Sequence, residues 1–180
     1  MNQLPFHIPD ELFALAKSSS FQGSYQLDEL KLSSDTYRFL EPLFYEITVT
    51  NTGGSFYISG FVSGKATTEC VRCLEDAVYD LEGEIEAYYI VSDSDVVVDG
   101  EDDEVEYEIL PEDHLIDLEP LIRAALVLEL PYVPLCKDDC KGLCPKCGAN
   151  LNDGPCNCAL DDIDESNPFA ILKTITFDND

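Results

Sequence analysis

Apolar and polar side chains alternate along two stretches of this chain, and a glycine-containing turn separates them. Leu43–Val49 is apolar at every second position, and Ser55–Ser63 resumes the alternation after the turn Asn51–Gly54. Successive side chains of a strand point to opposite faces, so this pattern predicts a β-hairpin with one buried face. The preceding residues are less patterned: Glu11–Lys17 suggests a short helix and Ser24–Leu27 a strand.

A third stretch, residues 79–91, alternates most strictly. One parity is mostly apolar, and the other carries four carboxylates: Asp80, Glu82, Glu84 and Glu86. In a strand these carboxylates line one face at a spacing of roughly 6.5–7 Å. Two interpretations stay open: a solvated face that keeps the sheet soluble, or a surface for a basic partner. We take the four residues as the candidate partner-binding site.

An apolar helix is predicted after this strand. Asp117 can cap it, Pro120 is tolerated in its first turn, and Pro131 stops it after Leu130. Because the segment has almost no polar face, we expect the helix to be buried across the apolar face of the sheet.

These elements predict an α+β fold, with an antiparallel β-sheet covered by one buried apolar helix and a small C-terminal cysteine-rich zinc module. We expect residues 1–135 to form the α+β core domain, with an acidic surface loop at 92–113. Residues 136–180 would form the zinc-binding module and a C-terminal helix that begins near Asn167.

The charge of the chain restricts its partners. It has 180 residues, 37 of them acidic and 10 basic, for a net charge of -27. Residues 75–119 contain no Lys or Arg. The electric field of this net negative charge repels phosphate backbones and anionic lipid, and it attracts basic proteins. The basic footprint of a nucleic-acid binder is absent, so we expect no direct binding to naked RNA, no DNA and no membrane as partners.

Six of the eight cysteines lie in one short segment: Cys136, Cys140, Cys144, Cys147, Cys156 and Cys158. The sequence Cys144-Pro-Lys-Cys147-Gly148 is typical of a zinc knuckle, in which Gly148 takes a positive φ. Met1–Ser20 lacks the pattern of a secretion signal, which predicts a cytoplasmic chain with reduced thiols. Clustered cysteines there are more often metal ligands than a disulfide or redox framework.

Four of these six thiols would bind one zinc ion, and the choice of four stays open. Cys144 and Cys147 form the first pair, and either Cys136 with Cys140 or Cys156 with Cys158 supplies the second. Our first expectation is one ion with two spectator thiols. The alternative adds a second ion that uses Cys70 and Cys73.

The sequence does not predict an enzyme. All-thiolate sites are normally closed and structural. His7 and His114 form no His-x-x-x-His or Glu-paired arrangement near the cysteines, and no phosphate-binding loop, nucleophile motif or dinucleotide fingerprint is present.

The order of several motifs is similar to that of a known family. These are Cys-Val-Arg-Cys-Leu-Glu from Cys70, a helix ending in Glu-Leu-Pro-Tyr-Val-Pro-Leu-Cys136, Cys-Lys-Gly-Leu-Cys-Pro-Lys-Cys-Gly-Ala-Asn-Leu-Asn from Cys140, and Asn-Pro-Phe-Ala-Ile-Leu-Lys from Asn167. Over about residues 65–173 the chain resembles the YceD family, the large ribosomal RNA subunit accumulation proteins of bacteria and plastids. The resemblance implies a non-enzymatic factor needed for normal levels of large-subunit ribosomal RNA, often encoded beside a small basic ribosomal protein.

We therefore expect a ribosome biogenesis factor needed for the synthesis, processing or stability of large-subunit ribosomal RNA. The chain is acidic and its end after Lys173 is not basic. Action through a basic large-subunit ribosomal protein or the pre-ribosomal particle is thus favoured over direct RNA binding. Two alternatives remain, a general zinc-ribbon interaction adaptor and a metal- or thiol-dependent enzyme. A pull-down that identifies the bound proteins separates the ribosome factor from the adaptor, and a loss of partner binding without any turnover disfavours the enzyme.

Overall fold

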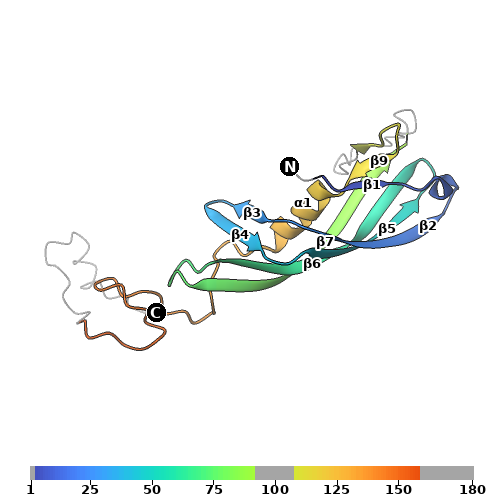
Figure 1. Ribbon diagram of the computed structural model, residues 1–180. Helices are drawn as coiled ribbons and strands as arrows, with labels where there is room; N and C mark the ends of the chain where they lie inside the picture. Colours follow the sequence, from blue (N-terminus) through green and yellow to red (C-terminus); the bar gives the residue numbers. More distant parts are fainter. Residues whose placement is uncertain (1–2, 92–107, 159–180) are drawn as a thin grey trace, which may run out of the picture.

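The computed structural model describes residues 3–91 and 108–158. Within these residues the chain forms a seven-stranded sheet, a separate two-stranded sheet and one α-helix, α1 (Glu119–Glu129) (Figure 1). Apart from one short parallel pair, β7 with β8, the sheets are antiparallel. The α+β fold class predicted from the sequence is confirmed.

Two long strands form the centre of the large sheet. β6 (Ser55–Glu69) and β7 (Asp76–Ile90) pair along their whole length, from Ser55 opposite Ile90 to Glu69 opposite Asp76. β5 (Leu43–Asn51) pairs with the first half of β6 through a turn in which Gly53 and Gly54 have positive φ. The predicted hairpin is therefore present, although β6 continues beyond the predicted end at Ser63.

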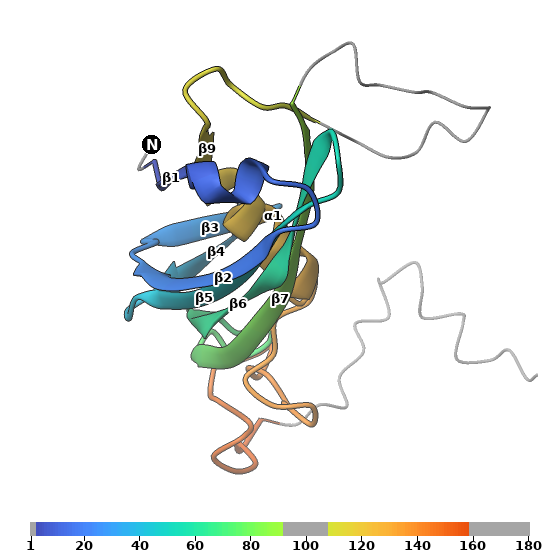
Figure 2. The ribbon, with the colours of Figure 1, turned by 90° about the vertical axis from the view of Figure 1, so that its right-hand side faces the viewer.

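The other side of the sheet is one long hairpin whose two limbs are each interrupted once. The first limb is β2 (Ser18–Tyr25) and β3 (Glu29–Leu32), and the second is β4 (Asp35–Phe39) and β5. The N–H of Phe39 donates to the carbonyl of Asp28 at 3.0 Å, which joins the limbs at the interruption. The resulting sheet is strongly twisted and curves around α1 (Figure 2).

Helix α1 packs on the inner face of the sheet, where Ile122 and Leu126 are fully buried. Its start is fixed by Asp117, whose carboxylate accepts a hydrogen bond from the N–H of Glu119 at 3.0 Å and another from that of Leu4 at 2.9 Å. The N-cap residue itself is Leu118, which makes no side-chain capping hydrogen bond, so the predicted cap at Asp117 is one residue too early. The predicted burial is correct for one side only, because Leu128 on the outer side is 82% exposed.

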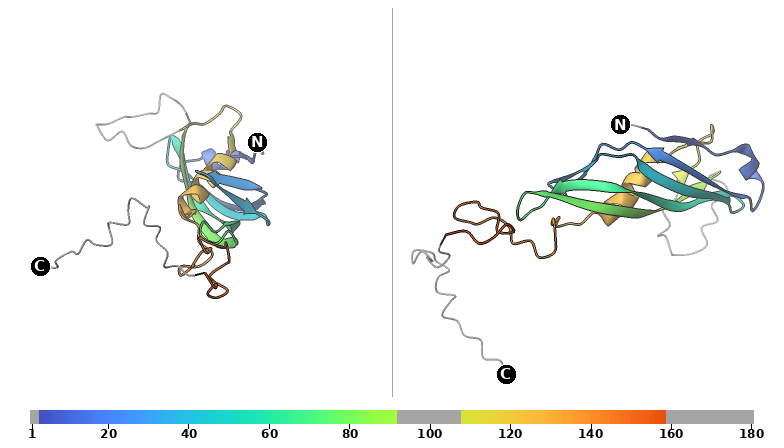
Figure 3. Two further views of the ribbon diagram at one scale, coloured as in Figure 1. Left: turned by 90° about the vertical axis from the view of Figure 1, so that its left-hand side faces the viewer. Right: turned by 60° about the horizontal axis from the view of Figure 1, so that its bottom comes forward.

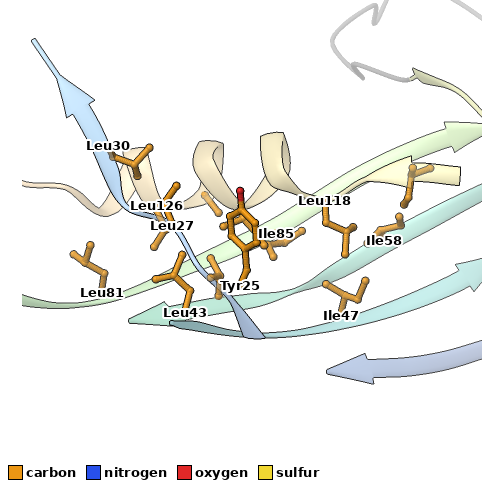
Figure 4. Close-up of a cluster of buried hydrophobic side chains, with 14 of the residues drawn as sticks. Tyr25, Leu27, Leu30, Leu43, Ile47, Ile58, Leu81, Ile85, Leu118 and Leu126 are labelled. Atoms are coloured by element: carbon orange, nitrogen blue, oxygen red, sulfur yellow. The ribbon is translucent and has the colours of Figure 1, made fainter. Parts of the chain in front are cut away.

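The hydrophobic core lies between α1 and the sheet. Side chains from β2, β5, β6 and β7 meet the helix there, as the close-up in Figure 4 shows for Tyr25, Ile47, Ile58, Ile85 and Leu126. The close approach of helix and sheet requires a glycine in β7. A Cβ on Gly83 would lie 2.6 Å from the carbonyl oxygen of Ala125, so a larger residue would push the helix away.

Shorter elements complete the described part. The two-stranded sheet consists of β1 (Pro5–His7) and β9 (Leu115–Asp117), and η1 (Asp10–Phe13) is a 3-10 helix where a short helix over Glu11–Lys17 was predicted. β8 (Glu108–Ile109) adds a parallel pair at the end of β7.

Two predictions fall largely outside the described residues. Most of the acidic loop at 92–113 and the C-terminal helix near Asn167 lie there. The division at residue 135 stays a prediction. Across residues 3–91 and 108–158, no helix has both the length and the apolar character needed to cross a membrane.

Candidate metal centres

The eight cysteines come together in two groups of four. The first centre is Cys70, Cys73, Cys136 and Cys140, and the second centre is Cys144, Cys147, Cys156 and Cys158. Within each group all four Sγ atoms lie within 4.8 Å of one another, and all eight cysteines are free thiols. Four sulfurs about 2.3 Å from one tetrahedral zinc lie ~3.8 Å apart, so both groups have the dimensions of a zinc site.

The first centre joins the end of the sheet to the segment that follows α1. Cys70 and Cys73 lie on the turn between β6 and β7, and Cys136 and Cys140 lie beyond the helix. The Sγ atoms of Cys70 and Cys140 are 3.7 Å apart, and those of Cys73 and Cys136 are 3.5 Å apart. Three of the four side chains are buried, and Ala77 belongs to the same buried cluster.

Hydrogen bonds to the sheet hold the segment after α1 in place. The Tyr37 hydroxyl donates to the carbonyl of Pro131 at 2.6 Å, and the Tyr79 hydroxyl donates to the carbonyl of Leu135 at 2.8 Å. At the turn, the N–H of Val71 donates to the carbonyl of Pro134 at 3.0 Å. These hydrogen bonds hold both the β6–β7 turn and the segment after α1, and these two parts carry the ligands of the first centre.

Arg72, between the two cysteines of the turn, adds contacts to the same segment. Its guanidinium donates to the carbonyl of Cys140 at 2.9 Å, and its own carbonyl accepts from the N–H of Leu143 at 3.1 Å. Gly142 has φ 73°, and a Cβ there would lie 3.0 Å from the Arg72 carbonyl oxygen. The two halves of the first centre are thus in close backbone contact.

The two Cys-x-x-Cys turns share one geometry. The residue after the second cysteine has a positive φ in both, 62° at Leu74 and 72° at Gly148. Its N–H donates to the carbonyl of the first cysteine, at 2.9 Å for Cys70 and 2.8 Å for Cys144. The conformation predicted for Gly148 is confirmed. The knuckle turn at Leu74 was not predicted, because a non-glycine residue gives no such signal.

These turns aim backbone N–H groups at the first sulfur of each pair. Hydrogen bonds from the N–H groups of Cys147 and Lys146 lower the pKa of Cys144 to about 6. Burial raises the pKa of Cys70, but backbone hydrogen bonds, including those from Cys73 and Arg72, outweigh it and lower the pKa to about 6. Each centre therefore contains one thiol stabilised as the thiolate that zinc requires.

The crowding of the remaining sulfurs has the opposite effect. The contact with Cys73, together with burial, raises the pKa of Cys136 to about 12, and the contact with Cys147, together with burial, raises that of Cys158 to about 12. Four thiolates this close repel one another unless a cation lies between them. An all-sulfur tetrahedral set suits zinc or an iron–sulfur centre, and both groups fit zinc.

The second centre is built on loops beyond the end of the sheet (Figure 3). Cys144 is buried, but Cys147 is exposed and Cys156 and Cys158 are half-buried. A single β-bridge between Leu143 and Asn150 closes the turn around Cys144. This centre therefore has little protein framework around its ligands.

Asn152 connects the two centres. Its amide nitrogen donates to Sγ of Cys140 at 3.3 Å, and its amide oxygen accepts from the N–H of Lys141 at 2.9 Å. The first of these hydrogen bonds lowers the pKa of Cys140. A residue from the loop of the second centre thus contacts a ligand of the first.

The structure arranges the predicted ligands differently from our first expectation. That expectation was one ion within residues 136–158, whereas the sulfurs form two groups and Cys70 and Cys73 join Cys136 and Cys140. The repeated Cys-x-x-Cys spacing and a total of eight cysteines were the signals available in the sequence. The pairing of the two distant halves was not visible there.

The four predicted carboxylates lie on the outer face of β7, opposite α1, and all are exposed. Asp80 forms an ion pair with Lys65 across to β6 at 3.2 Å. The Tyr57 hydroxyl donates to Glu86 at 2.7 Å. Their shared face is as predicted, and their role in binding a partner stays a prediction.

Comparison with known proteins identifies the family of the chain. The sequence model of the family described as large ribosomal RNA subunit accumulation protein YceD matches residues 58–176. The chain belongs to the YceD family. The matched residues include both candidate metal centres and the carboxylates of β7.

Several curated proteins are similar to this YceD-family chain. An uncharacterized protein of Mycobacterium leprae is 32% identical over 110 residues, which are 61% of this chain and 49% of the relative. The large ribosomal RNA subunit accumulation protein YCED homolog 1, chloroplastic, of Arabidopsis thaliana is 39% identical over 64 residues, 35% of this chain and 20% of the relative. The uncharacterized protein YlbN of Bacillus subtilis is 29% identical over 134 residues, 73% of this chain and 74% of the relative.

The match spans about half the length of the mycobacterial relatives. No solved structure matches this YceD-family chain.

Proposed function

We propose that this YceD-family protein is a ribosome biogenesis factor that maintains large-subunit ribosomal RNA by binding a basic large-subunit ribosomal protein, free or on the pre-ribosomal particle. The family and the names of the plant relatives support the role in ribosomal RNA accumulation. The identity of the process rests on that similarity, and the nature of the partner rests on the charge of the chain.

The observation that carries the partner's chemistry is the row of exposed carboxylates on β7. Asp80, Glu82, Glu84 and Glu86 share one face of a strand, in a chain with a net charge of -27. A protein that contacts RNA phosphates displaces counterions with Lys or Arg side chains, whereas β7 carries neither and its neighbour β6 carries one, Lys65. A Lys/Arg-rich protein gains from long-range attraction to the same face, mostly in its association rate.

Zinc in both centres would have a structural role. Each centre supplies four thiolates, which leaves no open position for water or a substrate. The first centre would fasten the segment after α1 to the sheet, and the second would fold the loop beyond it. We therefore propose no catalysis at either ion.

Affinity capture tests the partner. Tagged full-length protein is incubated with dissociated large-subunit ribosomal proteins at low salt, and the bound proteins are identified. We expect basic large-subunit proteins to be retained and to be released as the Debye length falls towards ~8 Å near physiological salt. Retention of naked ribosomal RNA in preference to these proteins would contradict the proposed partner.

Deletion of the gene tests the process. We expect the ratio of large- to small-subunit ribosomal RNA to fall and large-particle assembly to slow. A copy of the gene in which the four carboxylates of β7 are replaced by amides is introduced into the deletion strain for comparison. This variant should keep the fold and both cysteine centres, so it isolates the effect of the acidic face. An unchanged RNA ratio and normal ribosome profiles in the deletion strain would refute the role.

A further inference from the structure

Among the residues that the structure describes, one edge of β7 is unpaired over most of its length. β6 occupies the other edge along the whole strand, whereas β8 reaches only Tyr89 and Ile90. In residues 3–91 and 108–158, no further strand pairs with β7. A strand with unpaired N–H and C=O groups is a template for an additional strand.

The hydrogen bonds at both ends of β7 show which residues face this edge. The N–H of Leu110 donates to the carbonyl of Ile90 at 2.8 Å on the β8 side, and the N–H of Val91 donates to the carbonyl of Gly54 at 3.0 Å on the β6 side. Backbone groups alternate sides along a strand. The even-numbered residues, Asp80 to Glu86, therefore direct their N–H and C=O groups to the open edge and their carboxylates to the outer face.

A groove lies along β7 beside helix α1. It encloses about 630 Å³, and its lining includes Glu82, Glu84, Glu86 and Ile85 of β7, Leu128 and Glu129 of α1, and Ser59–Phe61 of β6. Leu128 is 82% exposed although it belongs to a mostly apolar helix. An extra strand beside β7 would cover this side chain.

We infer that the open edge of β7 binds an extended basic segment of the protein partner as an added strand, with Lys or Arg at every second position and apolar residues between them. This inference rests on the proposed function and names the surface that performs it. The basic side chains would lie beside the carboxylates of β7. The apolar ones would lie in the groove next to Ile85 and Leu128.

Charge complementarity decides between possible occupants of the edge. A second copy of this strand would place its own carboxylates beside these, and like charges across a strand pair are unfavourable. Charged side chains on an edge strand are a common protection against self-association. The same carboxylates favour a basic strand, for which the main chain supplies affinity and the alternating side chains supply specificity.

A synthetic peptide tests strand addition without changing the protein. The probe is Lys-Val-Lys-Val-Lys-Val-Lys-Val with blocked ends, and the control of equal composition and charge is Lys-Lys-Lys-Lys-Val-Val-Val-Val. We expect the alternating peptide to bind the full-length protein about tenfold more tightly than the control. Amide hydrogen exchange at Asp80, Glu82, Glu84 and Glu86 should slow by a similar factor in its complex, because their N–H groups become bonded.

Removal of hydrogen bonds from either side of the interface sharpens the test. Glu84→Pro removes one carboxylate and one N–H at the open edge, and Glu84→Gln removes the carboxylate alone. We expect the proline variant to bind the alternating peptide several-fold more weakly than the glutamine variant. Methylation of the peptide's backbone nitrogens at alternate residues should cause the same loss with unaltered protein, whatever the stability of the proline variant.

The outcomes separate this inference from the proposed function. If both peptides bind equally and no amide of β7 gains protection, the edge does not accept a strand, although an intact basic ribosomal protein can still be retained through charge. If Glu84→Pro and Glu84→Gln retain that basic protein equally, the inference fails and the proposed function stands. If no basic large-subunit protein is retained and the RNA ratio is normal in a deletion strain, the proposed function fails.

Discussion

The two cysteine centres have the same ligands and nearly the same turn, but they differ in what surrounds them. The first centre is buried against the end of the sheet, and its two halves are held by Tyr79, Arg72 and the backbone of the β6–β7 turn. The second centre has an exposed ligand, Cys147, and nothing lies within 4 Å of a Cβ built on Gly148 or Gly154.

Because of this difference, a bound ion would have a different role at each centre. At the first centre the protein framework already brings the sulfurs together, so an ion adds a cross-link between elements that have their own packing. At the second centre no hydrophobic core is present among the described residues, so the binding energy of the ion would be the folding energy of the loop. The four predictions below test this contrast, from the largest effect to the smallest.

Metal removal should produce the largest effect. We expect two zinc ions per chain after purification under reducing conditions, and a strong chelator should remove the ion of the second centre first, because it is the more exposed. Residues 141–158 should then lose their structure, while the sheet stays folded. Elemental analysis and amide spectra during the titration measure both changes. Simultaneous loss of both ions would show that the two centres form one unit.

Replacing one ligand in each centre should reveal the difference in stability. Cys73→Ser should lower the melting temperature of the sheet by several degrees, because it loosens the β6–β7 turn and the segment after α1. Cys147→Ser should remove one zinc but leave the melting temperature within about one degree, since its loop makes little contact with the sheet. Equal shifts in thermal unfolding would mean that the second centre also supports the core.

A matched pair of glycines gives a finer comparison. Gly142→Ala and Gly148→Ala place a side chain at nearly the same φ, 73° and 72°. The left-handed conformation costs a non-glycine residue about 1–2 kcal/mol in either place. Only Gly142 also meets a neighbour, the Arg72 carbonyl oxygen at 3.0 Å. We expect Gly142→Ala to weaken zinc retention at the first centre more than Gly148→Ala does at the second, as measured by competition with a chelating dye.

The smallest effect on stability is expected away from both centres. Replacing Asp80, Glu82, Glu84 and Glu86 by amides should change the free energy of unfolding by less than about 1 kcal/mol, because exposed ion pairs contribute little. Both zinc ions should remain bound. The association rate with a basic large-subunit protein should fall at low salt and converge with that of the wild type at high salt. An unchanged rate at low salt would show that this face is only solvated.

The sequence predicts those strands that have one apolar and one polar face. β5, β6 and β7 satisfy this pattern, whereas β2 does not, because serines occupy half of its positions. The hydroxyls of Ser18 and Ser20 instead contact those of Thr50 and Thr48 on β5, at 2.8 and 2.9 Å. Such a strand is stabilised by its neighbour, and the strand predicted at Ser24–Leu27 overlaps only its last two residues, Ser24 and Tyr25.

The metal centres show the same limit of sequence reasoning. The turn at Cys144–Gly148 is local, and its glycine and spacing predict it. The approach of Cys73 to Cys136 joins residues 63 positions apart, and it depends on the length of β7 and on the direction in which α1 leaves the sheet. The spacing of the cysteines in the sequence gives neither the length of β7 nor the direction of α1. For this reason a single ion was our first expectation.

That separation of 63 positions has a consequence for the connectivity of the chain. An ion at the first centre would turn residues 73–136 into a closed ring. The entropy of closing a ring grows only with the logarithm of its length, and doubling the length costs ~0.6 kcal/mol. Insertions between β7 and β8 would therefore enlarge the ring at little cost. A single proteolytic cut in it would open the ring but leave both fragments attached to the same ion, in addition to the packing of α1 on the sheet and the pairing of β1 with β9.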